Sequence, residues 1–455
     1  MITDMTEGSP SKILWKFSMP MLLSVIFQQL YNVVESIVAG QFIGVDALAA
    51  VGASYPVTMI FMAVATGCNI GCSVVISQLF GAKSYGHMKT AVSTSLISVL
   101  ALSVFLTGAG FLLCRPILSL LNTPGNIFGD SALYLNVYIG GFVFLFLYNI
   151  CTGVFTALGD SKTPLYFLIF SSVGNIVLDL VFVICFHMGV GGVAWATFIA
   201  QGVSSMLAAL ALLRRLATVT TQHRYALFSW RMLGRICRIA VPSILQQSFI
   251  SVGNLFIQGL VNGYGSVVVA GYSAAVKLNT FAITSFTTMA NGLSSFTAQN
   301  IGAGKPERIR KGYRAGLLMA VCVVIPFVLA FFVFSRQMIG IFLDTANDTE
   351  NVVQVGVDFL RMVSPFYLLI GVKLMADGVL RGAGSMGAFM TSTFTDLVLR
   401  VALAYLLSIP FQALGIWLSW PIGWAVSTVL SVLFYATGIW KKNLYHTLPS
   451  QRAQT

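Results

Sequence analysis

Apolar stretches long enough to cross a bilayer follow one another along almost the whole chain of 455 residues. A membrane-spanning helix needs about 20 consecutive apolar residues, and short polar connections separate stretches of that length. Backbone groups in lipid must be satisfied internally, so we expect each stretch to be a helix. The sequence therefore predicts an all-α polytopic membrane protein with twelve transmembrane helices, near residues 14–43, 53–80, 90–114, 131–158, 164–186, 192–213, 236–262, 268–300, 312–334, 352–380, 388–410 and 415–440.

The composition excludes a soluble globular protein, and the motifs of ATP-driven pumps and hydrolases are missing. Hydrophobic residues make up 57% of the chain and charged residues only 9%, against roughly 25% charged in an average soluble domain. The seven Cys lie mostly inside apolar stretches and have no disulfide or metal-ligand spacing. We find no Walker A motif, zinc-ligand set or nucleophile elbow. We therefore expect a protein that is not an enzyme and needs no cofactor.

Lysine and arginine are distributed unevenly over the connections, which predicts how the chain is oriented. Of the 26 basic residues, 20 lie on the face that holds the N-terminus, whereas the opposite face holds only Arg115 and Arg336. Cytoplasmic loops are enriched in Lys and Arg, so both termini are predicted to be cytoplasmic, in a multi-pass protein of the cell membrane. The net charge of +12 then reflects topology, and we expect the lipid bilayer but no nucleic acid as a partner.

An internal repeat becomes visible when the chain is shifted against itself by about 222 residues. Pro20 then matches Pro242, and the region of Gln28, Gln29 and Asn32 matches that of Gln246, Gln247 and Asn254; further along, 77–83 matches 297–304 and 153–159 matches 378–384. Each half holds an even number of spans, so the two copies have the same orientation and are related by an axis along the membrane normal. We expect two homologous six-helix lobes, 1–213 and 236–440, a cytoplasmic linker over 214–235 and a cytoplasmic tail over 441–455.

Ionisable residues inside the spans are costly and need either a partner or a function. In the second half, Lys373 with Asp377 and Asp396 with Arg400 have i,i+4 spacing, which places opposite charges on one helix face. We expect each of these pairs to neutralise itself. The role of Lys277 stays open, as does that of Arg361.

The spans of the first half hold two carboxylates, Glu35 and Asp179, and their interior holds no Lys or Arg. Polar residues accompany both acids at helical spacing: Gln28, Tyr31 and Asn32 before Glu35, and Asn175 one turn before Asp179. One interpretation is structural, with protonated carboxyls hydrogen-bonded between helices. The other, which we favour, is a group that binds and releases a proton or ligates a small cation.

The whole chain resembles the MATE (multidrug and toxic compound extrusion) family of prokaryotic type. The resemblance rests on the two six-span lobes and on short motifs in order, namely Pro20, Gln28, Tyr31, Asn32, Glu35, Gly40, Gly44 and 47–50, then Gln78 with Gly81 and Ala82, Asn175 with Asp179, and 262–265. It implies an exporter of amphiphilic, often cationic compounds, driven by inward flow of protons or sodium ions and alternating between outward-open and inward-open states.

The resemblance also implies where the coupling cation binds. Family members build the site from an acid on the first helix, an Asn and an Asp on the fifth and a Thr on the sixth, which match Glu35, Asn175, Asp179 and Thr197. The first-helix acid is usually Asp, so Glu35 is a departure that leaves the choice between H⁺ and Na⁺ open. Some sodium-coupled members also use acids of the second lobe, for which Asp377 is the nearest candidate. Lys277 is kept as a second secondary candidate for a site residue of this lobe. We expect the substrate cavity to include Gln28, Tyr31, Asn32 and Asn254.

Two other functions compete with multidrug export. A flippase for a lipid-linked envelope precursor would keep the fold, and its anionic cargo would need cations such as Lys277, Arg361, Lys373 and Arg400 in the cavity. A membrane-embedded enzyme or a passive scaffold is the third alternative. We expect a monomer that exchanges amphiphilic small molecules for H⁺ or Na⁺.

Overall fold

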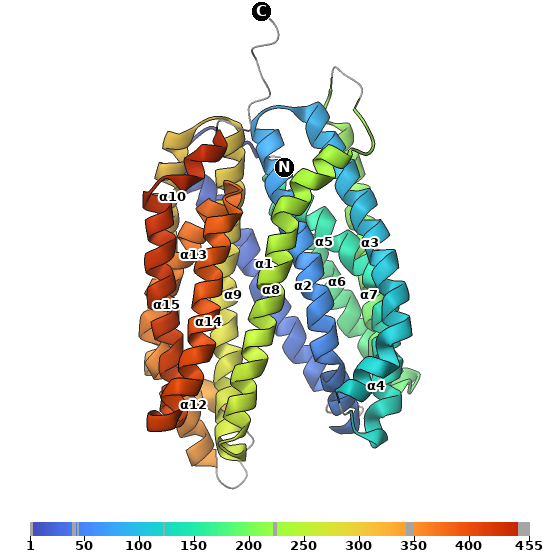
Figure 1. Cartoon of the computed structure of the whole chain (residues 1–455). Helices are drawn as coiled ribbons and strands as arrows, with labels where there is room; N and C mark the ends of the chain where they lie inside the picture. The colour runs from blue at the N-terminus through green and yellow to red at the C-terminus, as the bar shows by residue number, and fades with distance from the viewer. Residues whose placement is uncertain are drawn as a thin grey trace, which may run out of the picture. The chain divides into compact units, whose positions relative to one another are not determined.

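The computed structural model describes residues 3–38, 42, 45–121, 123–221, 225–342 and 349–444, and all regular secondary structure within them is helical (Figure 1). The helices of the first half are α1 (Pro10–Val38), α2 (Val45–Gly81), α3 (Tyr85–Leu120), α4 (Gly125–Gly140), α5 (Phe142–Ala157), α6 (Lys162–Leu180), a π-helical turn (Val181–Cys185) and α7 (Gly189–Ala217). Those of the second half are α8 (Trp230–Asn262), α9 (Ser266–Gly302), α10 (Pro306–Val333), α11 (Ser335–Gly340), α12 (Thr349–Val363), α13 (Tyr367–Gly382), α14 (Met386–Phe411) and α15 (Ala413–Ala436), followed by a 3₁₀ turn (Ile439–Leu444). The predicted all-α membrane fold is confirmed.

Eleven of the described helices are long and apolar enough to cross a membrane, or up to twelve if one bent pair counts as a single span. That pair is α4 with α5, which bend by 46° at Gly141. The sequence predicted one straight span over 131–158, whereas the structure breaks it at the adjacent glycines Gly140 and Gly141. Glycine pairs are a usual cause of sharp helix bends. A second break separates α12 from α13, where the 3₁₀ turn Ser364–Phe366 contains Pro365, which has no N–H to donate.

The chain forms two compact units whose boundaries differ from the lobe boundaries expected from the sequence. The first unit comprises Met1–Asp4 and Met19–Gln247, and the second comprises Met5–Ser18 and Ser248–Thr455. Helices α1 and α8 therefore each contribute to both units: α1 belongs to the second unit up to Ser18, and α8 belongs to the first unit up to Gln247. The lobe, linker and tail boundaries stay predictions about the repeat, and residues 222–224 and 445–455 lie outside the described residues.

Repeat-related glutamines anchor the segments that begin these two helices. In the first unit, Arg235 of α8 donates to Gln78 at the end of α2, over 2.8 Å. In the second unit, the backbone N–H of Met5 donates to Gln299 at the end of α9, over 2.9 Å, and Arg308 donates to backbone oxygens of the same N-terminal segment. Each anchor fixes the start of a helix that supplies polar side chains further along.

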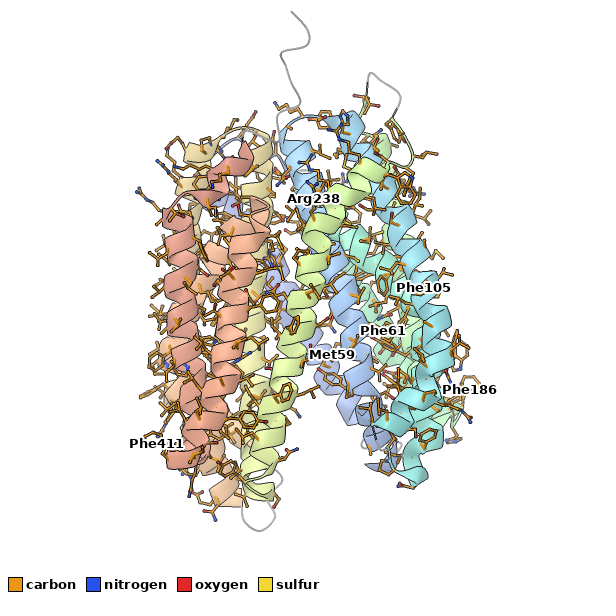
Figure 2. All side chains as sticks on the ribbon, viewed as in Figure 1. Met59, Phe61, Phe105, Phe186, Arg238 and Phe411 are labelled. Carbon is orange, nitrogen blue, oxygen red and sulfur yellow. The ribbon has the colours of Figure 1, made fainter. Side chains whose placement is uncertain are left out.

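Small residues let the helices of the first unit approach closely. A Cβ atom added to Gly67 would lie 2.3 Å from Ile244 Cγ1, and one added to Gly71 would lie 2.6 Å from Ala240 Cβ. Such contacts between α2 and α8 are typical of membrane helices, which associate by packing rather than by exclusion from water. Exposed phenylalanines such as Phe105 and Phe186 point outward from their helices, as lipid-facing residues do (Figure 2).

The second unit is held together by a buried aromatic cluster. The rings of Tyr272 and Trp417 stack with centroids 5.0 Å apart, and Phe359 contacts Trp417 edge-on at 5.2 Å. Aromatic pairs of this kind each contribute about 0.5–1.5 kcal/mol beyond the area they bury. The cluster joins α9, α12 and α15 and continues to Trp420, which lies beside the charged residues of this unit.

Candidate functional site

Helices α6 and α7 bring three of the predicted site residues together in the first unit. Asn175 and Asp179 lie one turn apart on α6, and Thr197 lies on the facing side of α7. All three are buried, with exposed fractions of 3%, 0% and 9%. A carboxyl group buried to this degree in a membrane protein must be stabilised by its immediate neighbours.

The neighbours of Asn175 set the orientation of its amide, because only one orientation satisfies both ends. The amide nitrogen then donates to Asp179 Oδ2 over 2.8 Å and to the Tyr31 hydroxyl oxygen over 3.1 Å. The amide oxygen accepts from Thr197 twice, from Oγ1 at 3.2 Å and from the backbone N–H at 3.0 Å. Asn175 thus lies at the centre of a cluster formed by α1, α6 and α7, which we call the first-unit cluster (Tyr31, Asn175, Asp179 and Thr197).

The other residues predicted for this region are only partly placed. The backbone of Glu35 belongs to α1, but its side chain lies outside the described residues, so its predicted role stays a prediction. Gln28 donates to Asn32 on the same helix over 3.2 Å, and both side chains are accessible. Asn254 is exposed on the part of α8 that belongs to the second unit.

Lys373 and Asp377 of α13 form the ion pair predicted from their spacing. Lys373 Nζ lies 2.7 Å from Asp377 Oδ2, and each side chain is only 4% exposed. Asp377 Oδ1 accepts a second hydrogen bond from Ser431 of α15 over 2.6 Å, and Ser431 is bonded in turn to Ser392 of α14. Both oxygens of the Asp377 carboxylate are therefore engaged, which does not favour this residue as an ion ligand.

The second predicted pair, Asp396 with Arg400, is wrong as an ion pair. The two side chains form no contact within the 4.0 Å of an ion pair, and neither Asp396 Oδ1 nor Arg400 Nε has a hydrogen-bond partner among the described residues. The Arg400 guanidinium lies instead over the ring of Trp420 on α15, 4.4 Å from its centroid. The i,i+4 spacing permits an ion pair, but the face of an indole on the neighbouring helix competes for a desolvated guanidinium.

Several residues of the charged interior could not be found from spacing along one helix. Ser431 and Trp420 lie on α15, and their positions relative to α13 and α14 depend on helix packing. The sequence predicted a span ending at residue 380, which placed Arg381 in a connection, but α13 extends through this residue. The Arg381 side chain is 6% exposed and donates to Asn291 of α9. Lys277 is exposed, with Nζ 5.8 Å from the centre of the Phe342 ring.

The first-unit cluster presents oxygen ligands of the kind that hard cations prefer. The Asp179 carboxylate and the two hydroxyls can ligate a small cation, and a carboxyl bonded to an amide can equally hold a proton. Over the part of the chain that the structure describes, no three His, Cys, Asp or Glu side chains gather as they would around a transition metal. The groups of the first-unit cluster are compatible with binding of H⁺ or Na⁺.

Comparison with known proteins places the chain in a family. The MatE family model matches residues 20–181 and 242–406, two segments that begin 222 residues apart, the shift found from the sequence. The chain is 29% identical to the probable multidrug resistance protein YpnP of Bacillus subtilis, over 96% of this chain and 97% of that protein. It is 22% identical to the probable multidrug resistance protein NorM of Thermotoga maritima, over 95% and 93%.

Solved structures agree with the sequence comparison. A structure described as the outward-facing conformation of a multidrug resistance MATE family transporter of the MOP superfamily matches with a TM-score of 0.89 at 25% identity, over 96% of this chain and 98% of that one. A MATE structure in the bent conformation matches with a TM-score of 0.88, which supports the same two-lobed fold of twelve helices. The chain belongs to the MATE family of multi-pass membrane transporters, which are not enzymes.

Proposed function

We propose that this protein is a secondary active multidrug efflux transporter that exports amphiphilic cationic compounds in exchange for H⁺ or Na⁺. Relatives described as multidrug resistance and export proteins, among them MepA of Staphylococcus haemolyticus, support the cargo class. The single observation that carries the exchange mechanism is the buried hydrogen-bond network in which Asn175 joins Asp179, Tyr31 and Thr197. We assign Glu35, Asn175, Asp179 and Thr197 as the cation-coupling residues.

In this mechanism the coupling ion and the drug compete through one set of hydrogen bonds. With Asp179 deprotonated and free of sodium, its negative charge favours a cationic drug. A proton or sodium ion arriving from outside neutralises the carboxylate and rearranges its bonds with Asn175 and, through it, with Tyr31 and Thr197. Linkage requires that each ligand weakens the binding of the other by the same factor, so ion entry drives drug release.

The topology that completes this proposal has both termini in the cytoplasm and the protein in the cell membrane as a monomer. Gln28, Tyr31, Asn32 and Asn254 are proposed to line the substrate cavity. Alternating access then exposes the cluster first to one side of the membrane and then to the other.

The proposal is tested by dye export in everted membrane vesicles. We expect a fluorescent cationic dye to move under an imposed proton gradient or an imposed sodium gradient, and the effective gradient names the ion. Glu35→Gln removes one charge and should abolish gradient-driven movement. Full export by Glu35→Gln would contradict the assignment of this residue, and no export by the wild type under either gradient would contradict multidrug antiport.

A second candidate function, a flippase for a lipid-linked envelope precursor, is favoured by one observation. Among its described residues, the second unit buries three cations, Lys373, Arg381 and Arg400, each at most 6% exposed. An anionic headgroup would need such charges. Alanine variants that lose an essential envelope function while drug resistance is unchanged would support the flippase.

A further inference from the structure

The first-unit cluster has a repeat-related position in the second unit, which a shared turn allows us to locate. Gly159 before α6 and Gly384 before α14 have the same left-handed backbone, with φ of 74° and 75°. Equivalent backbone hydrogen bonds close the two turns. The N–H of Asp160 donates to the carbonyl oxygen of Phe155, and the N–H of Ser385 donates to that of Leu380. Counting from these glycines therefore aligns α6 with α14 at an offset of 225 residues.

A contact between neighbouring helices aligns α7 with α15 in the same way. Ser204 of α7 bonds to the backbone oxygen of Phe167 on α6 over 3.3 Å. Ser392 of α14 bonds to the backbone oxygen of Ser427 on α15 over 3.1 Å. Phe167 and Ser392 are equivalent by the offset of 225, and the pairing makes Ser204 equivalent to Ser427, an offset of 223.

The next contact along each interface lies at the same offsets, but the residue types differ between the two units. Ser171 of α6 donates to the backbone oxygen of Ala200 on α7, over 3.5 Å. The equivalent residues are Asp396 and Gly423, and a Cβ atom on Gly423 would lie 2.8 Å from Asp396 Oδ1. A serine in the first unit is thus replaced by an acid, and the facing alanine by a glycine that makes room for it.

The third contact is the cluster itself. Asn175 and Thr197, which bond over 3.2 Å, are equivalent to Arg400 and Trp420. Figure 1 shows α14 and α15 side by side, and the guanidinium of Arg400 lies 4.4 Å from the centre of the Trp420 ring. The amide and hydroxyl that bond to each other in the first unit are replaced by a fixed positive charge on an aromatic face, a favourable arrangement for a desolvated cation.

The acids of the first-unit site have apolar counterparts. Asp179 is equivalent to Ala404 by the offset of 225, and Glu35 is equivalent to Ile257 by the offset of 222 that relates the two family matches. Ala404 and Ile257 are both completely buried. The second unit therefore lacks both carboxylates at the positions that would bind a mobile cation, and it has Asp396 one turn before Arg400 instead.

We propose that Arg400 is a built-in cation that occupies, in the second unit, the place taken by the coupling ion in the first. Asp396, one turn earlier on α14, supplies its counter-charge from beyond the 4.0 Å of an ion pair, and Trp420 and Gly423 shape the space that holds the two side chains. This unit then takes no coupling ion at that position, and exchange depends on the first-unit cluster alone. The inference rests on the function proposed above, and Arg400 acts in it as a positioning and specificity residue.

Chemical rescue tests the built-in cation on the purified full chain. Arg400→Ala should lower the Tm, and guanidinium chloride at concentrations far below denaturing ones should restore most of the loss, while equal sodium chloride should restore less. Guanidinium should not raise the Tm of the wild type or of Asp396→Ala/Arg400→Ala. Rescue that is no greater in Arg400→Ala than in the wild type would overturn the proposal.

A second variant covers the case in which Arg400→Ala does not fold. Arg400→Asn/Trp420→Thr copies the pair that already packs in the first unit, and adding Ala404→Asp rebuilds its carboxylate. We expect the number of ions moved per dye molecule to rise up to twofold in the triple variant, and an unchanged ratio in the folded protein would overturn the inference.

Asp179→Asn measured in parallel separates this inference from the proposed function. Full export by Asp179→Asn would contradict the proposed function, while the guanidinium result would still test Arg400.

Discussion

The two helix interfaces α6–α7 and α14–α15 share one backbone register but differ in how they handle charge. In the first unit, the Asp179 carboxyl accepts from the Asn175 amide at 2.8 Å, and Asn175 also bonds to the hydroxyls of Tyr31 and Thr197. In the second unit, Asp377 bonds to a lysine at 2.7 Å, and Asp396 lies one turn from Arg400. A carboxyl that accepts from a neutral amide can bind and release a cation. A carboxyl close to a lysine or arginine of the protein already has a fixed positive counter-charge. The comparison supports the proposal that ion exchange takes place in the first unit.

The largest expected effect comes from breaking the ion pair of the second unit. Lys373→Ala leaves Asp377 buried without its counter-charge, which should reduce the free energy of unfolding by about 3–5 kcal/mol. Thermal unfolding in detergent measures this loss. Lys373→Met/Asp377→Leu should recover most of it, because a well-packed apolar pair replaces a buried ion pair at little cost.

Lys277→Ala is the matched control, since Lys277 is exposed in the same unit. If Lys373→Ala were as stable as Lys277→Ala, the buried pair would not differ from a surface charge, and the contrast between the two units would be lost.

A smaller loss of stability is expected at Gly423, where the second unit has a glycine in place of the alanine of the first unit. Gly423→Ala places a Cβ atom 2.8 Å from Asp396 Oδ1 and 3.3 Å from its backbone oxygen. Overpacking of this kind costs about 1–3 kcal/mol, again read from thermal unfolding. Asp396→Ser/Arg400→Asn/Gly423→Ala places the first-unit residues at all three positions, leaves no buried arginine without a counter-charge and should regain stability.

Gly387→Ala is the control for this substitution, because nothing lies within 4 Å of an added Cβ atom there. Equal Tm values for Gly423→Ala and Gly387→Ala would contradict the close approach of α15 to Asp396.

The smallest effect concerns a single hydroxyl of the first-unit cluster. Thr197→Val keeps the shape of the side chain and its backbone N–H, but removes the Oγ1 contact with Asn175. A hydrogen bond of this kind contributes about 0.5–1.5 kcal/mol, so gradient-driven dye export should fall roughly two- to tenfold. Thr156→Val removes a hydroxyl bonded only within its own helix and should export normally. Equal rates for the two variants would remove Thr197 from the site.

Features confined to one helix were predictable from the sequence, and features between helices were not. The spacing of Lys373 and Asp377 determines their contact, because four residues make one helical turn. The same spacing failed for Asp396 and Arg400, since the indole of Trp420 comes from another helix. The bend at Gly141 was missed because the apolar residues of 131–158 are continuous and predict one span across it. The close approach of Gly67 and Gly71 to α8 is likewise a feature between helices.

Identification of the candidate site depended on both the residues and the family resemblance. Buried polar residues in an apolar span indicated Asp179 and Asn175, while Thr197 came only from the resemblance. Tyr31 was predicted for the cavity, and its bond to Asn175 depends on where α1 passes α6, which helical periodicity does not specify. The built-in cation required three successive helix contacts to establish the register, so no single-helix pattern would have indicated it.

Reciprocal exchange in proteoliposomes tests the central claim most directly. An imposed gradient of cationic dye, with no ion gradient, should drive H⁺ or Na⁺ in the opposite direction through the wild-type protein, because coupling of two ligands at one site acts both ways. We predict that Asp179→Asn loses this ion movement and that Asp130→Asn, which changes an exposed acid of the same unit, retains it. Dye-driven ion movement that persists in Asp179→Asn would contradict the account.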